Sequence, residues 1–130
     1  MKVLALDYGR ARTGVAVSDP TGTVARPLEV IERAGSDQGI ARLAELAERE
    51  AAERIVVGLP ITLRGEVGAQ AAETARFIER LKAAVDVPVE SFDERFTTRL
   101  AQATPSRAPE DAAAAAHLLT TYLEWSSSHR

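Results

Sequence analysis

Acidic residues stand at the positions where predicted strands end or where a predicted helix begins. Asp7 follows the first apolar segment, Asp93 and Glu94 follow the last one, and Asp111 falls in the first turn of the final helix. Strand ends on one edge of a sheet can meet in space. Carboxylates gathered there raise one another's pKa, so such a cluster is typical of a site for divalent cations. Cations between carboxylates and a phosphate support phosphodiester hydrolysis.

Each of these acids also has a structural interpretation. Asp7 could cap the turn that contains Gly9, because acidic side chains suit turns. An acid in a first helical turn, such as Asp111, more often interacts with the positive end of the helix dipole. Asp93 and Glu94 are adjacent, so on an extended segment they point to opposite faces and one of them is expected to reach a shared site.

Basic and hydroxyl side chains accompany the acids. Arg10 and Arg12 flank the first turn, and these two side chains could contact phosphates or simply be solvated. Arg26 is also expected near this turn. A second group follows Glu94 and consists of Arg95, Thr97 and Thr98. The two threonines could donate to phosphate or cap a short helix.

Composition limits the chemistry that is available. The 130 residues are 45% hydrophobic, which suits one domain with a single core. The chain has no cysteine and only two histidines, so oxygen ligands and hard cations such as Mg²⁺ or Mn²⁺ are favoured. The net charge of -3 is not typical of a nucleic-acid-binding protein, although the arginines are clustered. No leader and no apolar run of about 20 residues is seen, which predicts a cytoplasmic protein with no membrane segment.

The elements that must position these residues follow from periodicity and turn signals. Short apolar runs bounded by turn signals predict strands at 2–7, 13–18, 24–31, 54–58 and 87–92, the first three in an antiparallel meander. Helical spacing predicts helices at 36–52, with Ser36 as N-cap, at 69–84, and from about 109 onward. The fold class is therefore α/β, with helices on both sides of a mixed sheet. One domain is expected over 1–125, followed by a flexible tail at 126–130.

Four sequence blocks, taken together and in this order, resemble the YqgF/RuvX family. They are LALDYG with GVAVSD at 4–9 and 14–19, VVGLP at 56–60 with Gly65, DERFTT at 93–98, and DAAAA at 111–115. The resemblance covers nearly the whole chain. It implies an RNase H-like fold, in which three antiparallel strands of a five-stranded sheet are continued by parallel ones. It also implies an Mg²⁺- or Mn²⁺-dependent nuclease whose acidic positions fall on Asp7, Glu94 and Asp111.

Two departures from the family pattern concern substrate binding. The usual Lys-Arg pair of the first motif reads Ala11-Arg12 here, and the segment between Thr98 and Asp111 is shorter and poorer in basic residues than in relatives. Substrate contacts are therefore expected to differ or to come from the second copy of a homodimer.

The function expected from the resemblance is hydrolysis of phosphodiester bonds in structured nucleic acid. The substrate is a ribosomal RNA precursor, processed at the 5′ end of pre-16S rRNA, or a branched DNA of the Holliday-junction type, and the residues do not decide between them. One alternative is a non-catalytic nucleic-acid-binding module of the same fold, acting in ribosome maturation or transcription. Another is a phosphotransferase, because an Asp-x-Gly turn between strands also resembles the phosphate-binding turn of sugar kinases.

Overall fold

A computed structural model describes residues 1–59, 69–93 and 110–128. Its strands form one five-stranded sheet in the order β3-β2-β1-β4-β5. The bounds of the strands are β1 Val3–Asp7, β2 Arg12–Ser18, β3 Ala25–Glu32, β4 Arg54–Leu59 and β5 Val89–Asp93. Strands β1, β2 and β3 are antiparallel neighbours, whereas β4 runs parallel to β1 and β5 runs parallel to β4. The predicted meander and the mixed sheet are confirmed.

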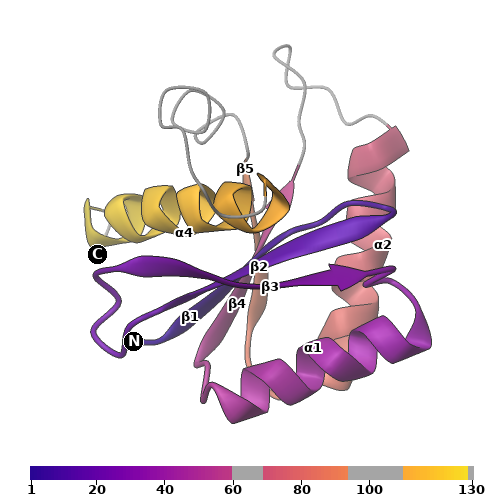
Figure 1. Ribbon diagram of the computed structural model, residues 1–130, viewed down its shortest axis with the longest axis horizontal. Coiled ribbons are helices and arrows are strands. Elements are labelled where there is room, and N and C mark those ends of the chain that lie inside the picture. The colour runs from indigo at the N-terminus through magenta and orange to yellow at the C-terminus, as the bar shows by residue number, and fades with distance from the viewer. Residues whose placement is uncertain (60–68, 94–109, 129–130) are drawn as a thin grey trace.

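In the part of the chain that the structure describes, three helices cover the sheet: α1 Asp37–Arg49, α2 Ala69–Ala84 and α4 Glu110–Ser128. Figure 1 shows α4 on one side of the sheet and α1 with α2 on the other. The predicted N-cap is confirmed, since the Ser36 side chain accepts a hydrogen bond of 3.1 Å from the Gly39 amide. Helix α4 continues to Ser128 and so includes three residues expected in the tail, because a polar sequence at a helix end does not fix its last turn.

Side chains of the central strand β1 alternate between two hydrophobic cores. Leu4 and Leu6 pack with residues of α1 and α2, including Leu43 and Phe77. Val3 and Ala5 point the other way and share the second core with α4, where Leu119 is fully buried. The sheet is therefore buried on both faces, and each successive residue of β1 belongs to the opposite layer.

Tight turns connect the antiparallel strands. In the β1–β2 turn, a Cβ atom on Gly9 would lie 2.4 Å from the Arg12 carbonyl oxygen, so the turn closes only around a glycine. In the β2–β3 turn, the Asp19 carboxylate accepts from the Thr21 hydroxyl and from the Val24 and Thr23 amides. These hydrogen bonds hold the pKa of Asp19 well below its usual range.

Within the described part of the chain, no helix has the length and apolar character needed to span a lipid bilayer.

Candidate active site

Asp7 is the last residue of β1, at the centre of the sheet. It pairs with Gly14 of β2, and its side chain is half-buried. Because side chains alternate along a strand, Asp7 lies on the same face as Val3 and Ala5, which is the face that α4 covers. The structure therefore places this carboxylate at a strand end and in the same layer as α4.

The carboxyl ends of three parallel strands lie on the same edge of the sheet. Asp7 ends β1, Leu59 ends β4 and Asp93 ends β5, and the last two are paired in register. Glu94, the predicted second ligand, is the next residue in the sequence after β5 and lies outside the described residues. Ligand sites in α/β sheets typically lie at this edge.

The third predicted ligand, Asp111, lies in the first turn of α4. The structure gives its place in the helix but does not describe its side chain. The residues that follow it, Ala112 and Ala113, are buried, and α4 contacts β1, β2 and β3. The beginning of α4 is thus packed against the molecule through alanines. Among the residues whose side chains are described, no three acidic, histidine or cysteine residues gather in a metal-binding group.

The predicted phosphate-contacting arginines lie beside Asp7 in the β1–β2 turn. The Arg10 side chain is 85% exposed and its Nη2 atom lies 3.2 Å from a carboxylate oxygen of Glu73 on α2. Arg12 is exposed at the start of β2, opposite Glu32 of β3. Arg26 was expected near this turn, and that expectation is wrong. It pairs with Val17 near the far end of β2 and contacts Glu50.

The remaining predicted contacts, Arg95, Thr97 and Thr98, lie outside the described residues.

A group of residues that the sequence does not indicate lies on the other side of the β1 end. The ring of Tyr8 stacks on Phe77 of α2, with ring centroids 4.3 Å apart, and its hydroxyl donates to Glu73 at 3.4 Å. Burial, and then the nearby Glu73 charge, raise the pKa of Tyr8. Hydrogen bonding from Arg10 lowers the pKa of Glu73. Only the position of Tyr8 directly after Asp7 could have drawn attention to this group.

The sheet order and the helices on both faces define an RNase H-like α/β fold, and solved structures agree. The chain superposes on Thermus thermophilus RuvC, solved in complex with a Holliday junction substrate, with a TM-score of 0.73 over 99% of this chain and 96% of that one, at 18% identity.

A family model described as "RuvX: Holliday junction resolvase" matches residues 1–125, so the chain belongs to the RuvX family. The resemblance noted from its motifs and the assignment to a class of nucleases are confirmed at this level. Relatives named as pre-16S rRNA nucleases include a protein from Chloroflexus aggregans, 40% identical over 94% of this chain and 92% of its own length. Another, from Desulforamulus reducens, is 39% identical over 95% of this chain and 97% of its own length.

Proposed function

We propose that this protein is a metal-dependent nuclease in which Asp7, Glu94 and Asp111 hold Mg²⁺ or Mn²⁺ against a phosphodiester of structured nucleic acid. The observation that carries the proposal is the position of Asp7. It ends the central strand, on the edge where β4 and β5 also end and in the layer that α4 occupies. Asp111 belongs to the first turn of α4, which lies in that layer, and Glu94 is the next residue in the sequence after β5.

The donor set fits a hard divalent cation. The chain has no cysteine, and carboxylate oxygens at strand ends are the ligands that Mg²⁺ and Mn²⁺ prefer. A cation bound there would supply an activated water and neutralise charge on the departing oxygen. The backbone that carries Asp7 is held on both sides, because it pairs with Gly14 of β2 and the residues before it pair with β4.

The arginines of the β1–β2 turn would orient the substrate. Arg10 and Arg12 lie within five residues of Asp7 and are exposed. Arg10 is also paired with Glu73, so it would have to leave that carboxylate to contact a phosphate next to the reacting one. Arg95, Thr97 and Thr98 are proposed to act in the same way because they follow Glu94 in the sequence.

The substrate is proposed to be a ribosomal RNA precursor, cut at the 5′ end of pre-16S rRNA. The relatives' names support this choice, whereas the family description and the RuvC match favour a Holliday junction. Junction resolution requires two active sites related by symmetry, and hence a homodimer. Precursor trimming has no such requirement. Sedimentation analysis with and without substrate therefore accompanies the cleavage assay.

The test compares Asp7→Asn with Asp86→Asn, an equal change at an exposed aspartate between α2 and β5. Both variants and the wild type are assayed on a precursor RNA and on a four-way DNA junction, with Mn²⁺, with Mg²⁺ and with a chelator. We expect Asp7→Asn to abolish metal-dependent cleavage while its melting temperature stays equal or rises, because carboxylate repulsion is relieved. Asp86→Asn should cleave like the wild type.

Wild-type rates for Asp7→Asn would exclude the proposed mechanism. Normal function of that variant in cells would favour the alternative, a non-catalytic nucleic-acid-binding module. Binding of ATP by the wild type, measured by calorimetry, would instead favour a phosphotransferase.

A further inference from the structure

A pocket of about 410 Å³ opens beside the β1–β2 turn, on the side of the sheet that α1 and α2 cover. Its walls come from the β1–β2 turn, from the connection between β3 and α1, and from one face of α2. We call it the arginine pocket and define it by six of its lining residues: Tyr8, Arg10, Arg33, Glu73, Arg76 and Arg80.

The arginine pocket concentrates positive charge in an acidic protein. Four arginines and a single carboxylate, Glu73, line it, although the chain as a whole has a net charge of -3. A concave surface lined by one sign of charge attracts ligands of the opposite sign. The pocket therefore favours an anion.

Two of the four arginines are in ion pairs and two are not, although, after the hydrogen bond from Arg10, the charge of Arg76 contributes to lowering the pKa of Glu73. Arg10 contacts Glu73 at 3.2 Å, and Arg80 contacts Asp37 at 2.7 Å and also donates to the Gly35 carbonyl. Among the described residues, no ion pair involves Arg33 or Arg76. Both are exposed, so their guanidinium groups can donate hydrogen bonds to an anionic ligand.

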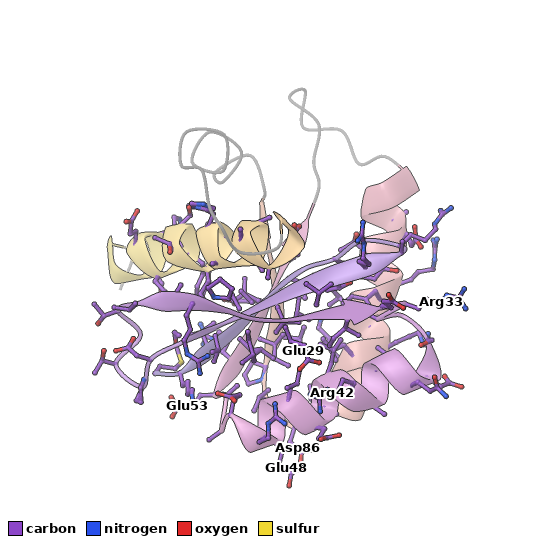
Figure 2. All side chains as sticks on the ribbon, in the orientation of Figure 1. Glu29, Arg33, Arg42, Glu48, Glu53 and Asp86 are labelled. Atoms are coloured by element: carbon purple, nitrogen blue, oxygen red, sulfur yellow. The ribbon has the colours of Figure 1, made fainter. Side chains whose placement is uncertain are left out.

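The backbone of Arg33 is held in an uncommon conformation. Its φ angle is 50°, in the left-handed region that residues other than glycine seldom adopt. Its amide donates to the Ala11 carbonyl at 2.9 Å, and its own carbonyl accepts from the Ser36 amide and hydroxyl. Such conformations persist where the surroundings determine them, and they occur often at ligand sites. Figure 2 shows the Arg33 side chain extending outward from this connection.

The aromatic residues of the pocket do not offer a platform for a base. Tyr8 and Phe77 stack on one another and are buried, so neither ring face is open for stacking. Guanidinium groups, by contrast, match the oxygens of a phosphate in a forked geometry. The chemistry of the pocket therefore selects the phosphate backbone of a nucleic acid rather than its bases.

The geometry points to a second function for the end of β1, and this inference rests on the proposed nuclease function. We infer that the arginine pocket binds a phosphate of the same nucleic-acid strand, on the flank of the cleaved bond. Arg33 and Arg76 bind the phosphate directly. Glu73 occupies Arg10 and so weakens the site. Tyr8 follows Asp7 and points to the opposite face of the sheet. A nucleic-acid strand that crosses this end of the sheet would therefore meet both the Asp7 site and the arginine pocket.

The test measures affinity and its salt dependence in the presence of a chelator, so that cleavage does not contribute. The variants are Arg33→Gln, Arg76→Gln and Glu73→Gln, with Arg49→Gln as a matched control at an exposed arginine in the last turn of α1. The probes are a labelled single-stranded RNA and a labelled four-way DNA junction, followed by fluorescence anisotropy. Thermal melting of each variant confirms that it is folded.

We expect Arg33→Gln and Arg76→Gln each to weaken binding by roughly tenfold, the effect of one charge-assisted hydrogen bond. The slope of log K against log salt should fall by about one in each variant. Glu73→Gln should tighten binding, which a purely structural role of the ion pair would not produce. Arg49→Gln should leave the slope unchanged.

Wild-type affinities and slopes for Arg33→Gln and Arg76→Gln would overturn the inference, as would an equal loss in Arg49→Gln. A loss on one probe only would assign the pocket to that nucleic acid. Because these measurements need no cleavage, a failure of the proposed nuclease function would appear only in the Asp7→Asn assay.

Discussion

The two sides of the β1 end differ in charge and in the layer they face. Asp7 lies on the side of α4, a helix whose first turn contributes Glu110 and Asp111. Tyr8 lies on the side of α1 and α2, where four arginines surround a pocket. The last residue of β1 and the residue that follows it thus face different layers, and the layer of Tyr8 carries the basic pocket.

In the proposals made above, this difference would let one end of the sheet serve two purposes. The proposed cation site takes carboxylate oxygens, whereas the proposed phosphate site takes arginines that are not all in ion pairs. The alternation of side chains along β1 separates the two sets by the thickness of the sheet. Glu73 is the exception, since it is a carboxylate among arginines.

The largest expected effect comes from truncating the core on each side. Leu119→Ala on the α4 side and Leu43→Ala on the α1 side remove fully buried leucines. Each should lower the free energy of unfolding by about 2–5 kcal/mol, the usual cost of such a cavity. Because both cores share β1 and β4, we expect a single transition in each variant.

Urea unfolding measures this effect with two probes. Far-ultraviolet circular dichroism reports on all elements, whereas fluorescence reports on Trp125, the only tryptophan, which lies on α4 near Phe92. The two transitions should coincide in both variants. Separate midpoints would mean that the two sides are independent units.

The next effect concerns the connection that forms the arginine pocket. In Gly39→Ala, the added Cβ atom would lie 2.4 Å from the Arg33 carbonyl oxygen and 2.5 Å from the Ala34 Cα atom, and both of these are backbone atoms that cannot rotate away. We expect a loss of about 1–3 kcal/mol in the free energy of unfolding, typical of overpacking, together with weaker nucleic-acid binding because Arg33 must move.

Gln38→Ala, at an exposed neighbouring position, is the control and should change neither quantity. Unfolding in urea and anisotropy with the labelled RNA provide both readings. A Gly39→Ala variant as stable as the wild type would show that the connection adapts, and it would remove the argument that Arg33 is held rigidly.

Local patterns predicted most of the fold. The apolar run of β1 and the helical spacing with Ser36 as N-cap predicted elements within a few residues of those observed. The observed start of β5 lies two residues after the predicted start, and this difference has a physical reason. Pro88 has no amide to donate, and its carbonyl accepts from Ile55, so the regular pairing begins at Val89 rather than at Val87.

The sites were predictable only in part. Asp7 stands out because an acid follows an apolar strand and precedes a glycine turn. The arginine pocket has no such signal, since Arg10, Arg33 and Arg76 come from three separate segments that only the tertiary packing brings together. Helical periodicity on α2 identifies Arg76 and Arg80 as exposed but does not indicate what lies opposite them.

A smaller effect tests the hydrogen bonds on the α4 side. The buried Tyr122 hydroxyl accepts from Arg54 at 2.9 Å and donates to Glu90, which lies 3.5 Å from Arg54. Tyr122→Phe should lower the free energy of unfolding by only about 1 kcal/mol, because Arg54 and Glu90 still form an ion pair with each other when the hydroxyl is removed. Tyr8→Phe should cost less, since its hydrogen bond to Glu73 is 3.4 Å long. Thermal unfolding of both variants at neutral pH measures the difference, and an equal or greater cost for Tyr8→Phe would contradict it.

The smallest effect appears at alkaline pH and uses the fact that the chain has two tyrosines, one on each side of the sheet. Burial raises the pKa of Tyr8 and of Tyr122 above the ordinary value, and the carboxylates Glu73 and Glu90 add to this. A raised pKa contributes stability that is complete below the unfolded pKa, near about 10, and is lost as pH rises through the folded value. Phenolate absorbance should therefore appear at higher pH in the native protein than in urea. Tyr8→Phe and Tyr122→Phe each leave one reporter, so each side titrates alone. A native titration that coincides with the unfolded one in either variant would show that the remaining tyrosine on that side is not desolvated.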